Sequence, residues 1–405
     1  MKRIVFLNRF YAPDLSATSQ ILTDLARDLA ARGVEVHAIA SRGRHDGASA
    51  RLPARETLDG VEVHRVAGAG FGGSRLAGRA AEYLAFYVAA WRALMTLAAP
   101  GDVLIAKTDP PLLSILAARA AARRGVVVVN WLKDLYPEVA IELGVPLVRG
   151  PIGRSLLRAR DRSLAAARMN VAIGTAMAGR LKAHGVPETR LRIVPDWCDD
   201  TAIQPLSHAA NPLRRDWGLE GRFAVGYSGT LGRAHEIETL MSAAERLRDD
   251  ARIVFLCIGD GVGFRTLRAR VEAGGLAQRF RFFPRQDRAA LAQSLGAADA
   301  HWISLRPALE GLVLPSKLYG VAAAGRPILA VAARNGELAR LVEAHACGIA
   351  IEPGDGAGFA AAIRHLASDP DAAASMGRRA RVMLDAQFSR RAALERWQAL
   401  LDEIG

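Results

Sequence analysis

The stretch LEGLVLPSKLYGVAAAGRPIL, residues 309–329, contains a polar turn, a helix of small residues and an apolar strand in immediate succession. Ser316 stands where the N-cap of that helix is expected, so the next backbone amides would point outward with the positive end of the helix dipole. Lys317 beside the helix start is suited to a phosphate, and Glu310, further upstream, is suited to sugar hydroxyls. The stretch predicts a loop–helix–strand unit of an α/β fold with a nucleotide-sugar site in its loop.

Lysine is scarce in this chain, which makes Lys317 more informative. Among 54 basic residues only five are lysines: Lys2, Lys107, Lys133, Lys182 and Lys317. Because arginine is the usual cation here, a retained lysine indicates a position that needs a compact point charge instead of a planar guanidinium. The simpler alternative is a loop that only caps the helix and leaves Lys317 solvated; the lysine count favours the phosphate contact.

The length of the chain indicates two domains. With 405 residues, of which 51% are hydrophobic, two cores of about 200 residues each are expected. Three scattered cysteines, Cys198, Cys257 and Cys347, have no metal-binding spacing and favour a reducing compartment. The start of the chain does not resemble a signal peptide, so a cytoplasmic location is expected.

The net charge of +13 has two explanations that stay open together: anionic partners and, for part of the excess, a plain bias of composition. Nucleic acid is disfavoured, because the aromatic residues do not alternate with basic ones as a base-stacking surface requires. An anionic membrane surface together with phosphorylated substrates explains the charge more simply.

The most hydrophobic stretch is YLAFYVAAWRALMTLA, residues 83–98. At about 16 residues, and with Arg92 inside it, the stretch is too short and too charged to span a bilayer. Two interpretations stay open. It is either a core helix under a sheet, or an amphipathic helix in the membrane interface with Tyr83, Tyr87 and Trp91 at headgroup level.

Short apolar segments alternate with helical patterns along the chain, which predicts doubly wound parallel sheets. In the first half we expect strands at residues 3–8, 34–40, 61–66, 103–106, 126–130, 170–173 and 192–194, with the first helix at 18–32. In the second half we expect strands at 223–228, 253–258, 281–283, 298–303, 327–332 and 348–351. The predicted domains are 1–196 and 197–385, with a C-terminal helix at 386–405 that packs back on the first domain. Ligands are expected at the carboxyl ends of the strands, in the cleft between the domains.

Glycine-rich turns follow two strands of the second half. In YSGTLGRAHE, residues 227–236, Gly229 and Gly232 would let backbone amides approach an anion that Arg233 neutralises. In CIGDGVG, residues 257–263, a strand again runs into glycines, the first of which is Gly259. A single glycine turn is weak evidence of binding, but these two and the 309–329 loop at strand ends of one sheet indicate one anion site.

Two segments of the first half also follow strand ends. The loop NRFYAPDLSATSQ, residues 8–20, is longer than an ordinary strand-to-helix connection and predicts a binding loop. In NWLKDLYPE, residues 130–138, Asp134 is either a catalytic or hydroxyl-binding carboxylate, which we favour, or only an ion-pair partner of Lys133.

Two motifs are set aside. GAGFGG, residues 68–73, fits the dinucleotide pattern, but no acid lies about 20 residues further on and the motif does not follow the first strand of a βαβ unit. Asp369-Pro370-Asp371 resembles a metal-binding pair, but Ser368-Asp369-Pro370 is ordinary N-cap chemistry. No metal is predicted.

The chain resembles the large retaining glycosyltransferase family four (group one), and in particular the branch that builds O-antigen and colanic-acid-type polysaccharides. The resemblance rests on FYAPDLSATSQILTDLARDLAARGVEV, DPPLLSILAARAAARRG, NWLKDLYPE, IGTAMAGRL, VPDWCD, YSGTLGRAHEIETL and LVLPSKLYGVAAAGRPI, and so covers essentially the whole chain. It implies the GT-B fold, with two Rossmann-like domains facing across a cleft. It also implies transfer of a sugar from a nucleotide diphosphate sugar, expected to be UDP-linked, to a hydroxyl of a polyprenyl-diphosphate-linked glycan.

The chain departs from the family pattern at several positions. The second glutamate of the family's Glu-x7-Glu, which normally holds the ribose, falls on Gly320, and Glu310 can stand for the first only at altered spacing. The family's frequent arginine and lysine after the second-domain glycine fall on Thr230 and His235. The diphosphate contacts therefore move to Lys317 and Arg233. In the first loop Ser16-Ala17-Thr18 replaces the usual pair of glycines.

These arguments assign three sets of residues. The donor-binding set is Gly229, Thr230, Arg233, Gly259, Glu310, Pro315, Ser316, Lys317 and Leu318; the acceptor-binding set is Asn8, Tyr11, Ser16, Thr18 and Lys133; the catalytic set is Asp134, Glu310 and Lys317. No cofactor is expected, and the enzyme is expected on the inner face of the cytoplasmic membrane or in the cytoplasm. Two rivals stay open: a GT-B nucleotide-sugar epimerase, and a non-catalytic nucleotide-sugar-binding subunit suggested by Gly320.

Overall fold

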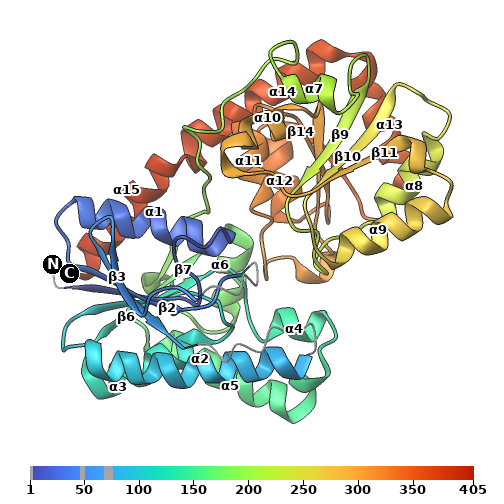
Figure 1. Cartoon of the computed structure of the whole chain (residues 1–405). Helices are drawn as coiled ribbons and strands as arrows, with labels where there is room; N and C mark the ends of the chain where they lie inside the picture. The colour runs from blue at the N-terminus through green and yellow to red at the C-terminus, as the bar shows by residue number, and fades with distance from the viewer. Residues whose placement is uncertain (1–2, 46–50, 68–75) are drawn as a thin grey trace. The chain divides into compact units, whose positions relative to one another are not determined.

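The computed structural model describes residues 3–45, 51–67 and 76–405 and divides the chain into two compact units (Figure 1). Unit 1 comprises Met1–Pro195 and Leu394–Gly405, and unit 2 comprises Asp196–Ala393. The motif at residues 68–73 lies outside the described residues. No helix in the described ranges is long and apolar enough to cross a bilayer.

Unit 1 is built on an eight-stranded sheet with the order β3-β4-β2-β1-β5-β6-β7-β8. Its strands are β1 (Ile4–Leu7), β2 (Val36–Ser41), β3 (Arg55–Leu58), β4 (Val61–Val66), β5 (Val103–Ala106), β6 (Val127–Leu132), β7 (Met169–Ala172) and β8 (Leu191–Ile193). Every neighbouring pair is parallel except β3 and β4, which form an antiparallel hairpin at one edge. The carboxyl ends of the parallel strands therefore share one edge of the sheet.

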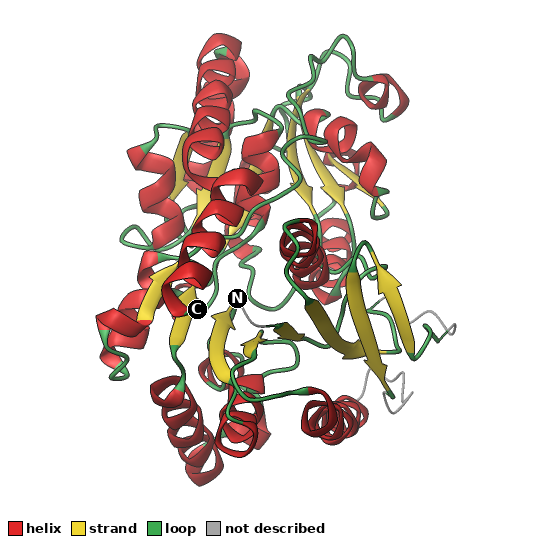
Figure 2. Ribbon diagram, turned by 90° about the vertical axis from the view of Figure 1, so that its left-hand side faces the viewer, coloured by secondary structure: helices red, strands yellow, loops and turns green. Residues whose placement is uncertain are grey.

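The helices of unit 1 form two layers around this sheet (Figures 1 and 2). They are α1 (Ala17–Ala31), α2 (Leu76–Leu97), α3 (Leu113–Arg124), α4 (Glu138–Glu142), α5 (Gly150–Ala166), α6 (Thr175–Ala183) and the end of α15 (Arg390–Ile404), with short 3₁₀ turns at Pro146–Val148 and Glu188–Arg190. Figure 1 shows α2, α3 and α5 on one side of the sheet and α1 and α15 on the other. On α2, Phe86, Ala90 and Leu94 are fully buried against strand residues such as Leu104, so this helix contributes to the core.

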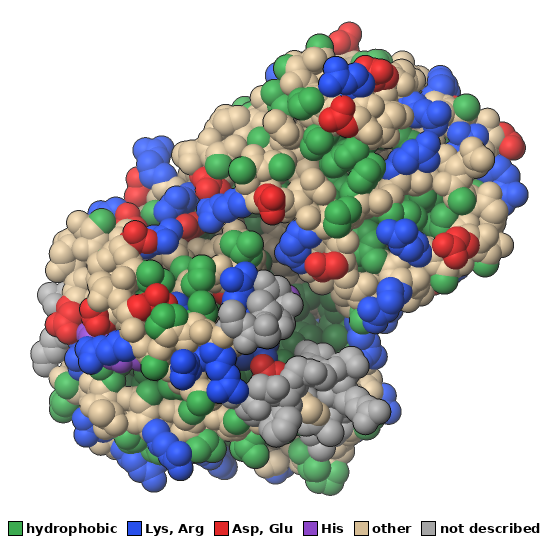
Figure 3. Space-filling model, viewed as in Figure 1, with side chains coloured by type: hydrophobic (Ala, Val, Ile, Leu, Met, Phe, Trp, Pro, Cys, Tyr) green, Lys and Arg blue, Asp and Glu red, His purple; other side chains and the backbone are tan. Residues whose placement is uncertain are grey.

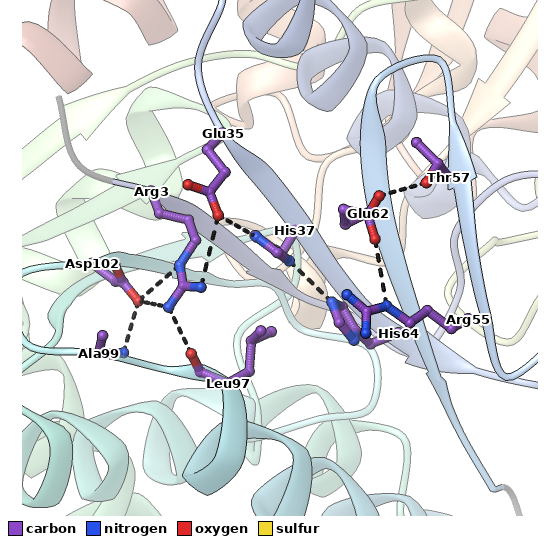
Figure 4. Close-up of polar contacts among 10 residues, drawn as sticks. All are labelled: Arg3, Glu35, His37, Arg55, Thr57, Glu62, His64, Leu97, Ala99 and Asp102. Atoms are coloured by element: carbon purple, nitrogen blue, oxygen red, sulfur yellow. Dashed lines mark hydrogen bonds and ion pairs between the residues drawn. The ribbon is translucent and has the colours of Figure 1, made fainter.

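The amino edge of the unit 1 sheet is fixed by polar contacts (Figure 4). The Arg3 guanidinium donates to Asp102 at 2.7 Å and to the Leu97 carbonyl at 2.6 Å, joining β1 to the end of α2 and the start of β5. A ring nitrogen of His37 on β2 lies 3.0 Å from one of His64 on β4. The Arg3 contacts lie at the opposite edge of the sheet from the carboxyl ends of its parallel strands.

Unit 2 contains a six-stranded, fully parallel sheet with the order β11-β10-β9-β12-β13-β14. Its strands are β9 (Phe223–Ser228), β10 (Ile253–Ile258), β11 (Phe280–Phe283), β12 (Ala300–Ser304), β13 (Ile328–Val331) and β14 (Gly348–Ile351). The strand order reverses between β9 and β12, and doubly wound sheets bind ligands at the carboxyl side of such a switch point.

Helices cover both faces of the unit 2 sheet. They are α7 (Pro212–Asp216), α8 (Glu238–Arg246), α9 (Val262–Ala273), α10 (Leu291–Gly296), α11 (Lys317–Ala323), α12 (Glu337–Ala344), α13 (Gly356–Ser368) and α14 (Pro370–Met383), with 3₁₀ turns at Ala277–Arg279, Arg288–Ala290 and Pro307–Leu309 and a π-helical turn at Leu384–Phe388. The core on the α8, α9 and α13 side contains Tyr227 and Trp302, whose rings lie 4.6 Å apart, and a stacked pair of Phe255 and Phe280.

The predicted α/β fold is confirmed, and the strands at residues 223–228, 253–258 and 348–351 have the predicted bounds. Strand β3 was not predicted, because its alternately exposed and half-buried residues carry little apolar signal. The Ser316 N-cap is wrong in detail: Ser316 has helical angles and its side chain makes no capping hydrogen bond. The Asp369 cap is confirmed, since its side chain accepts a hydrogen bond from the Ala372 amide at 2.9 Å.

Candidate active site

The glycine turns of unit 2 pack backbone against backbone at the carboxyl ends of β9 and β10. Gly229 has a φ of +121° and Gly259 a φ of +132°. A Cβ at Gly259 would lie 2.2 Å from the Gly229 carbonyl oxygen, so no other residue fits there. The two turns therefore form one continuous backbone surface, as the sequence predicted for an anion site.

Lys317 at the start of α11 brings a positive charge to this surface. A Cβ at Gly229 would lie 3.2 Å from the Lys317 Cε, so the lysine stem passes directly over the glycine. The Lys317 ammonium lies 5.2 Å from the centre of the Tyr227 ring, close enough for a cation–π contact. The structure thus places Lys317 and Gly229 together, as predicted.

His235 holds this lysine and was not among the predicted site residues. Its Nδ1 lies 2.7 Å from the Ser304 carbonyl oxygen, which can only accept, so the ring proton is on Nδ1. Its Nε2 then accepts a hydrogen bond from Lys317 Nζ at 3.3 Å. Burial, helped by the Lys317 charge, lowers the pKa of His235 to about 3, so the ring is neutral at physiological pH. A neutral imidazole orients the lysine without neutralising its charge.

The environment also shifts the pKa of Lys317. Burial, with a smaller contribution from the Arg285 charge, lowers it to about 8. The lysine is therefore mostly charged at pH 7 but titrates in the mildly alkaline range. An amine that burial has partly desolvated gains more from an arriving diphosphate than a solvated one does, because bound anion replaces the missing water.

A second cation, Arg285, follows β11 at the same edge of the sheet. Its guanidinium donates to the Thr230 hydroxyl at 2.7 Å and pairs with Asp260 at 3.1 Å. Thr230, predicted from its place in the glycine turn, therefore belongs to a polar cluster that joins the ends of β9, β10 and β11. The sequence did not identify Arg285 and Asp260 as site residues, because their only distinguishing feature is that each follows a strand. The predicted Arg233 is exposed on the turn after β9.

The PSK turn differs from its prediction. The Leu318 amide donates to the Pro315 carbonyl and the Tyr319 amide donates to Ser316, so these amides are already used within the turn. The Leu318 side chain is fully buried in the core of unit 2. Pro315, Ser316 and Leu318 thus shape the turn that presents Lys317, and the predicted outward-pointing amides are wrong for Leu318 and Tyr319.

Glu310 has a structural contact that the sequence did not reveal. Its Oε1 accepts a hydrogen bond from the Glu337 amide at 2.7 Å, at the start of α12. A Cβ at Gly336 would lie 2.6 Å from Glu310 Oε2 and 2.8 Å from the Ala333 carbonyl oxygen, so a larger residue would displace the carboxylate or the backbone beside it. Glu310 therefore fixes the start of α12 to the loop before α11, and its predicted role toward a sugar stays a prediction.

The long first loop of unit 1 contains buried polar atoms. The Tyr11 hydroxyl, the Ser16 and Thr18 side-chain oxygens and the Asn8 Oδ1 have no hydrogen-bond partner in the described part of the chain. The Ser16 amide is held by the Asp14 carboxylate at 2.8 Å, which fixes the loop before α1. Unpartnered buried polar groups are costly in a native protein and are typical of a ligand-binding loop. This favours the predicted role of these four residues.

A group of buried charges lies beside this loop, at the carboxyl ends of β5 and β6. Burial raises the pKa of Asp134 to about 6 and lowers that of Lys133 to about 7. Lys107 and Asp109 follow the carboxyl end of β5. Burial lowers the pKa of Lys107 well below its usual value and raises the pKa of Asp109. Lys107 was missed as a site residue; it lies over the Trp131 ring at 3.9 Å and donates to the Thr18 carbonyl at 2.9 Å.

Both units thus present polar groups with shifted pKa values at the carboxyl edges of Rossmann-like sheets. Two such units in one chain, the second with glycine turns around a half-buried lysine, are the architecture of the GT-B class of proteins.

Comparison with known families agrees with this class. Residues 17–197 match the Glycosyl transferase 4-like domain and residues 222–369 match the Glycosyl transferases group 1 domain. The chain belongs to the group 1, family-four type of glycosyltransferases.

The individual relatives share less than 30% sequence identity with the chain. The chain is 27% identical over 307 residues to the probable glycosyltransferase WbjE of Pseudomonas aeruginosa, covering 76% of each. It is 29% identical to the putative colanic acid biosynthesis glycosyl transferase WcaI of Escherichia coli, over 47% of each. Among solved structures, sucrose-phosphate synthase from Thermosynechococcus elongatus is similar over the whole chain and 99% of its own, with a TM-score of 0.79 and 16% identity. Anabaena HepE in complex with UDP-glucose is similar over the full length of both, with a TM-score of 0.74 and 16% identity.

Proposed function

We propose that this protein transfers a sugar from a UDP-linked donor, held by unit 2, to a hydroxyl of a lipid-linked glycan acceptor, held by unit 1, in the synthesis of a bacterial surface polysaccharide. The observation that carries the proposal is the Lys317 amine, oriented by His235 over the Gly229 turn at the switch point of the unit 2 sheet. The UDP and UDP-glucose complexes of Anabaena HepE support the choice of donor. The relatives WbjE and WcaI support the polysaccharide product.

The donor half-reaction depends on positive charge. As the bond between the sugar and the diphosphate breaks, negative charge grows on the departing nucleotide, and Lys317 and Arg233 stabilise it. Fixed donors of this kind commonly contribute about 3 kcal/mol each to the transition state. Arg285 lies at the ends of neighbouring strands, where it adds to the positive potential.

The acceptor half-reaction is assigned to unit 1. Asp134, once ionised, orients the acceptor hydroxyl by accepting a hydrogen bond from it, and Lys133 beside it favours the ionised form. The polar atoms of Asn8, Tyr11, Ser16 and Thr18 supply hydrogen bonds to acceptor hydroxyls. Retention of configuration and independence from metal ions follow the family expectation, with the departing phosphate as the group that receives the proton.

A ligand and turnover screen tests the function. The protein is heated with UDP, GDP or ADP and with their sugar conjugates, and release of free nucleotide is followed with and without glycan lipid extracts. We expect UDP to raise the melting temperature of the protein. We also expect UDP to be released slowly from its sugar conjugate without acceptor and faster when acceptor is present. Stabilisation by UDP with no turnover under any condition would favour a non-catalytic subunit, and epimerised sugar without transfer would favour the epimerase.

A further inference from the structure

The layer of α2, α3 and α5 in unit 1 has an outer surface that the proposed chemistry does not use. The inner side of α2 is buried in the core, but Leu84 is 65% exposed and Val88 44% exposed on its outer side. Ile152 at the start of α5 is 54% exposed. A hydrogen bond between Ser163 of α5 and Ser114 of α3 joins these neighbouring helices. Three large apolar side chains thus project from one helical layer.

A groove lies between α2 and α3 on this surface. It has a volume of about 620 Å³ and is lined by apolar and aromatic side chains together with arginines: Tyr87, Val88, Trp91, Arg92, Met95, Leu116, Arg119 and Arg123. The Arg123 guanidinium lies 5.3 Å from the centre of the Trp91 ring. Half-buried aromatic rings beside arginine are the composition found at the boundary between lipid headgroups and acyl chains.

The charge of the layer has one sign. Exposed arginines occur on all three helices: Arg92, Arg119, Arg123, Arg154, Arg158 and Arg162. The sequences of α2, α3 and α5 contain only two acids, and both are paired: Glu82 with Arg9, and Asp161 with Arg160. Figure 3 shows basic and hydrophobic side chains interspersed on the lower rim of unit 1, where α3 and α2 lie in Figure 1.

The apolar side chains extend from the middle of the layer to the carboxyl edge of the sheet. Helices α2 and α5 both follow parallel strands and so begin at the carboxyl edge of the sheet and run toward the amino edge. Leu84 and Val88 lie on either side of the midpoint of α2, and Ile152 lies in the first turn of α5. Ile152 is therefore on the side of the layer nearest Asp134 and the first loop, and Leu84 and Val88 lie near the middle of the layer.

We propose that the outer face of α2, α3 and α5, called here the basic face, docks on an anionic lipid bilayer, with Leu84, Val88 and Ile152 inserted between the headgroups and the arginines on lipid phosphates. Docking on the bilayer does not depend on the proposed function. Its consequence, that a lipid-linked acceptor reaches unit 1 without leaving the membrane, rests on the proposed function.

Other occupants fit the basic face less well. A second copy of the chain would bring arginines against arginines in a symmetric contact, which costs free energy. Nucleic acid would need exposed aromatic rings on which bases stack, whereas Tyr87 and Trp91 are half-buried against the core. Attraction of about 1 kcal/mol for each basic residue near an anionic bilayer, together with the apolar groups, is consistent with reversible binding.

Vesicle co-sedimentation of the full chain tests the proposal. Vesicles of phosphatidylcholine with 30% phosphatidylglycerol, on the order of a bacterial surface charge, are compared with pure phosphatidylcholine. We expect binding to the anionic vesicles that weakens with salt. The double variants Arg119→Glu/Arg123→Glu and Leu84→Asp/Val88→Asp are each expected to reduce partitioning about tenfold or more. The matched controls are Arg378→Glu and Val382→Asp on α14 of unit 2, where Val382 is also 65% exposed; these should bind as the unmodified protein does.

The depth of insertion has a separate readout. Brominated lipids should quench the fluorescence of the unmodified protein more than that of Trp91→Phe, since Trp91 lines the groove. Equal binding by the basic-face variants and the α14 controls would overturn the proposal. So would failure of the unmodified protein to bind anionic vesicles, or a dimer in light scattering that the basic-face variants abolish.

A water-soluble acceptor with a short lipid chain distinguishes failure of the proposed function from failure of the proposed docking surface. The two basic-face variants should turn over this acceptor at the rate of the unmodified protein while losing turnover of the vesicle-bound acceptor. Vesicle binding without any turnover would overturn the function and leave the docking surface intact. Normal turnover of both acceptors by the variants would overturn the docking surface and leave the function intact.

Discussion

Replacing Lys317 with alanine removes the amine over the Gly229 turn and tests the donor site directly. The backbone surface formed by the glycine turns and the core residues around α11 are untouched by the change. Loss of one fixed donor to the leaving group lowers turnover by about 100- to 1,000-fold, equivalent to about 3 to 4 kcal/mol in the transition state. Lys182→Ala is the matched control, because Lys182 is exposed on α6 in unit 1 and forms a surface ion pair with Glu188.

The pKa of Lys317 adds a second, independent signature. With a pKa of about 8, about nine-tenths of the amines are charged at pH 7 and about one-tenth at pH 9. Since kcat/KM reports the free enzyme, it should fall about tenfold between pH 7 and pH 9. Lys317→Arg keeps the charge over this whole range, so the alkaline decline should disappear even if the overall rate is lower.

The assay follows UDP release and product formation at subsaturating donor across pH 5 to 10, a range that runs from about one unit below the pKa of Asp134 to about two units above the pKa of Lys317. Lys317→Ala within about threefold of the unmodified rate would refute the assignment of the lysine to the leaving group. An alkaline decline that persists unchanged in Lys317→Arg would show that another group titrates there.

Three further predictions concern other residues. His235→Leu, which removes the acceptor of the Lys317 hydrogen bond, should reduce kcat/KM about tenfold. His235→Gln, whose amide oxygen can accept this hydrogen bond, should retain most of the activity. An equal loss in both variants would show that His235 contributes by packing and does not orient Lys317. Asp134 must be ionised, so activity should rise with pH through about 6, and Asp134→Asn should lose this rise together with on the order of 100-fold in turnover; a lower melting temperature with an unchanged pH profile would reduce Asp134 to a structural partner of Lys133. Asp369→Ala should lower the free energy of unfolding by about 1 kcal/mol in a denaturant titration and leave turnover unchanged. Addition of EDTA to the unmodified protein should also leave turnover unchanged; inhibition by EDTA would reveal a metal requirement.

The strands and the glycine turns were predictable because they depend on local sequence. Buried parallel strands need continuous apolar runs, and tight turns with positive φ need glycine, so both leave a pattern within a few residues. Strand β3 illustrates the limit of the apolar signal. Its hairpin was encoded instead in Asp59-Gly60, whose φ values of +50° and +79° are typical of a two-residue turn between antiparallel strands.

The partners within the site were not predictable in this way. His235 touches Lys317 from a turn 82 residues earlier in the chain, and Arg285 meets Thr230 across 55 residues. These contacts exist because parallel strands bring their carboxyl ends to one edge, and no local pattern records which side chains meet there. Glu310 shows the converse, since an acid selected for sugar binding by its position also holds the start of α12.

The path of α15 has a consequence for how the protein is made. Residues from Leu394 onward belong to unit 1, where Trp397 packs against Trp131 with ring centres 4.6 Å apart. A ribosome synthesising this chain must therefore complete all of unit 2 before the helix that covers Trp131 emerges. Unit 2 is continuous in sequence and can fold while translation proceeds, but unit 1, although started first, finishes last. Premature termination anywhere before α15 would leave unit 1 with an uncovered tryptophan, a ready target for the cell's quality control.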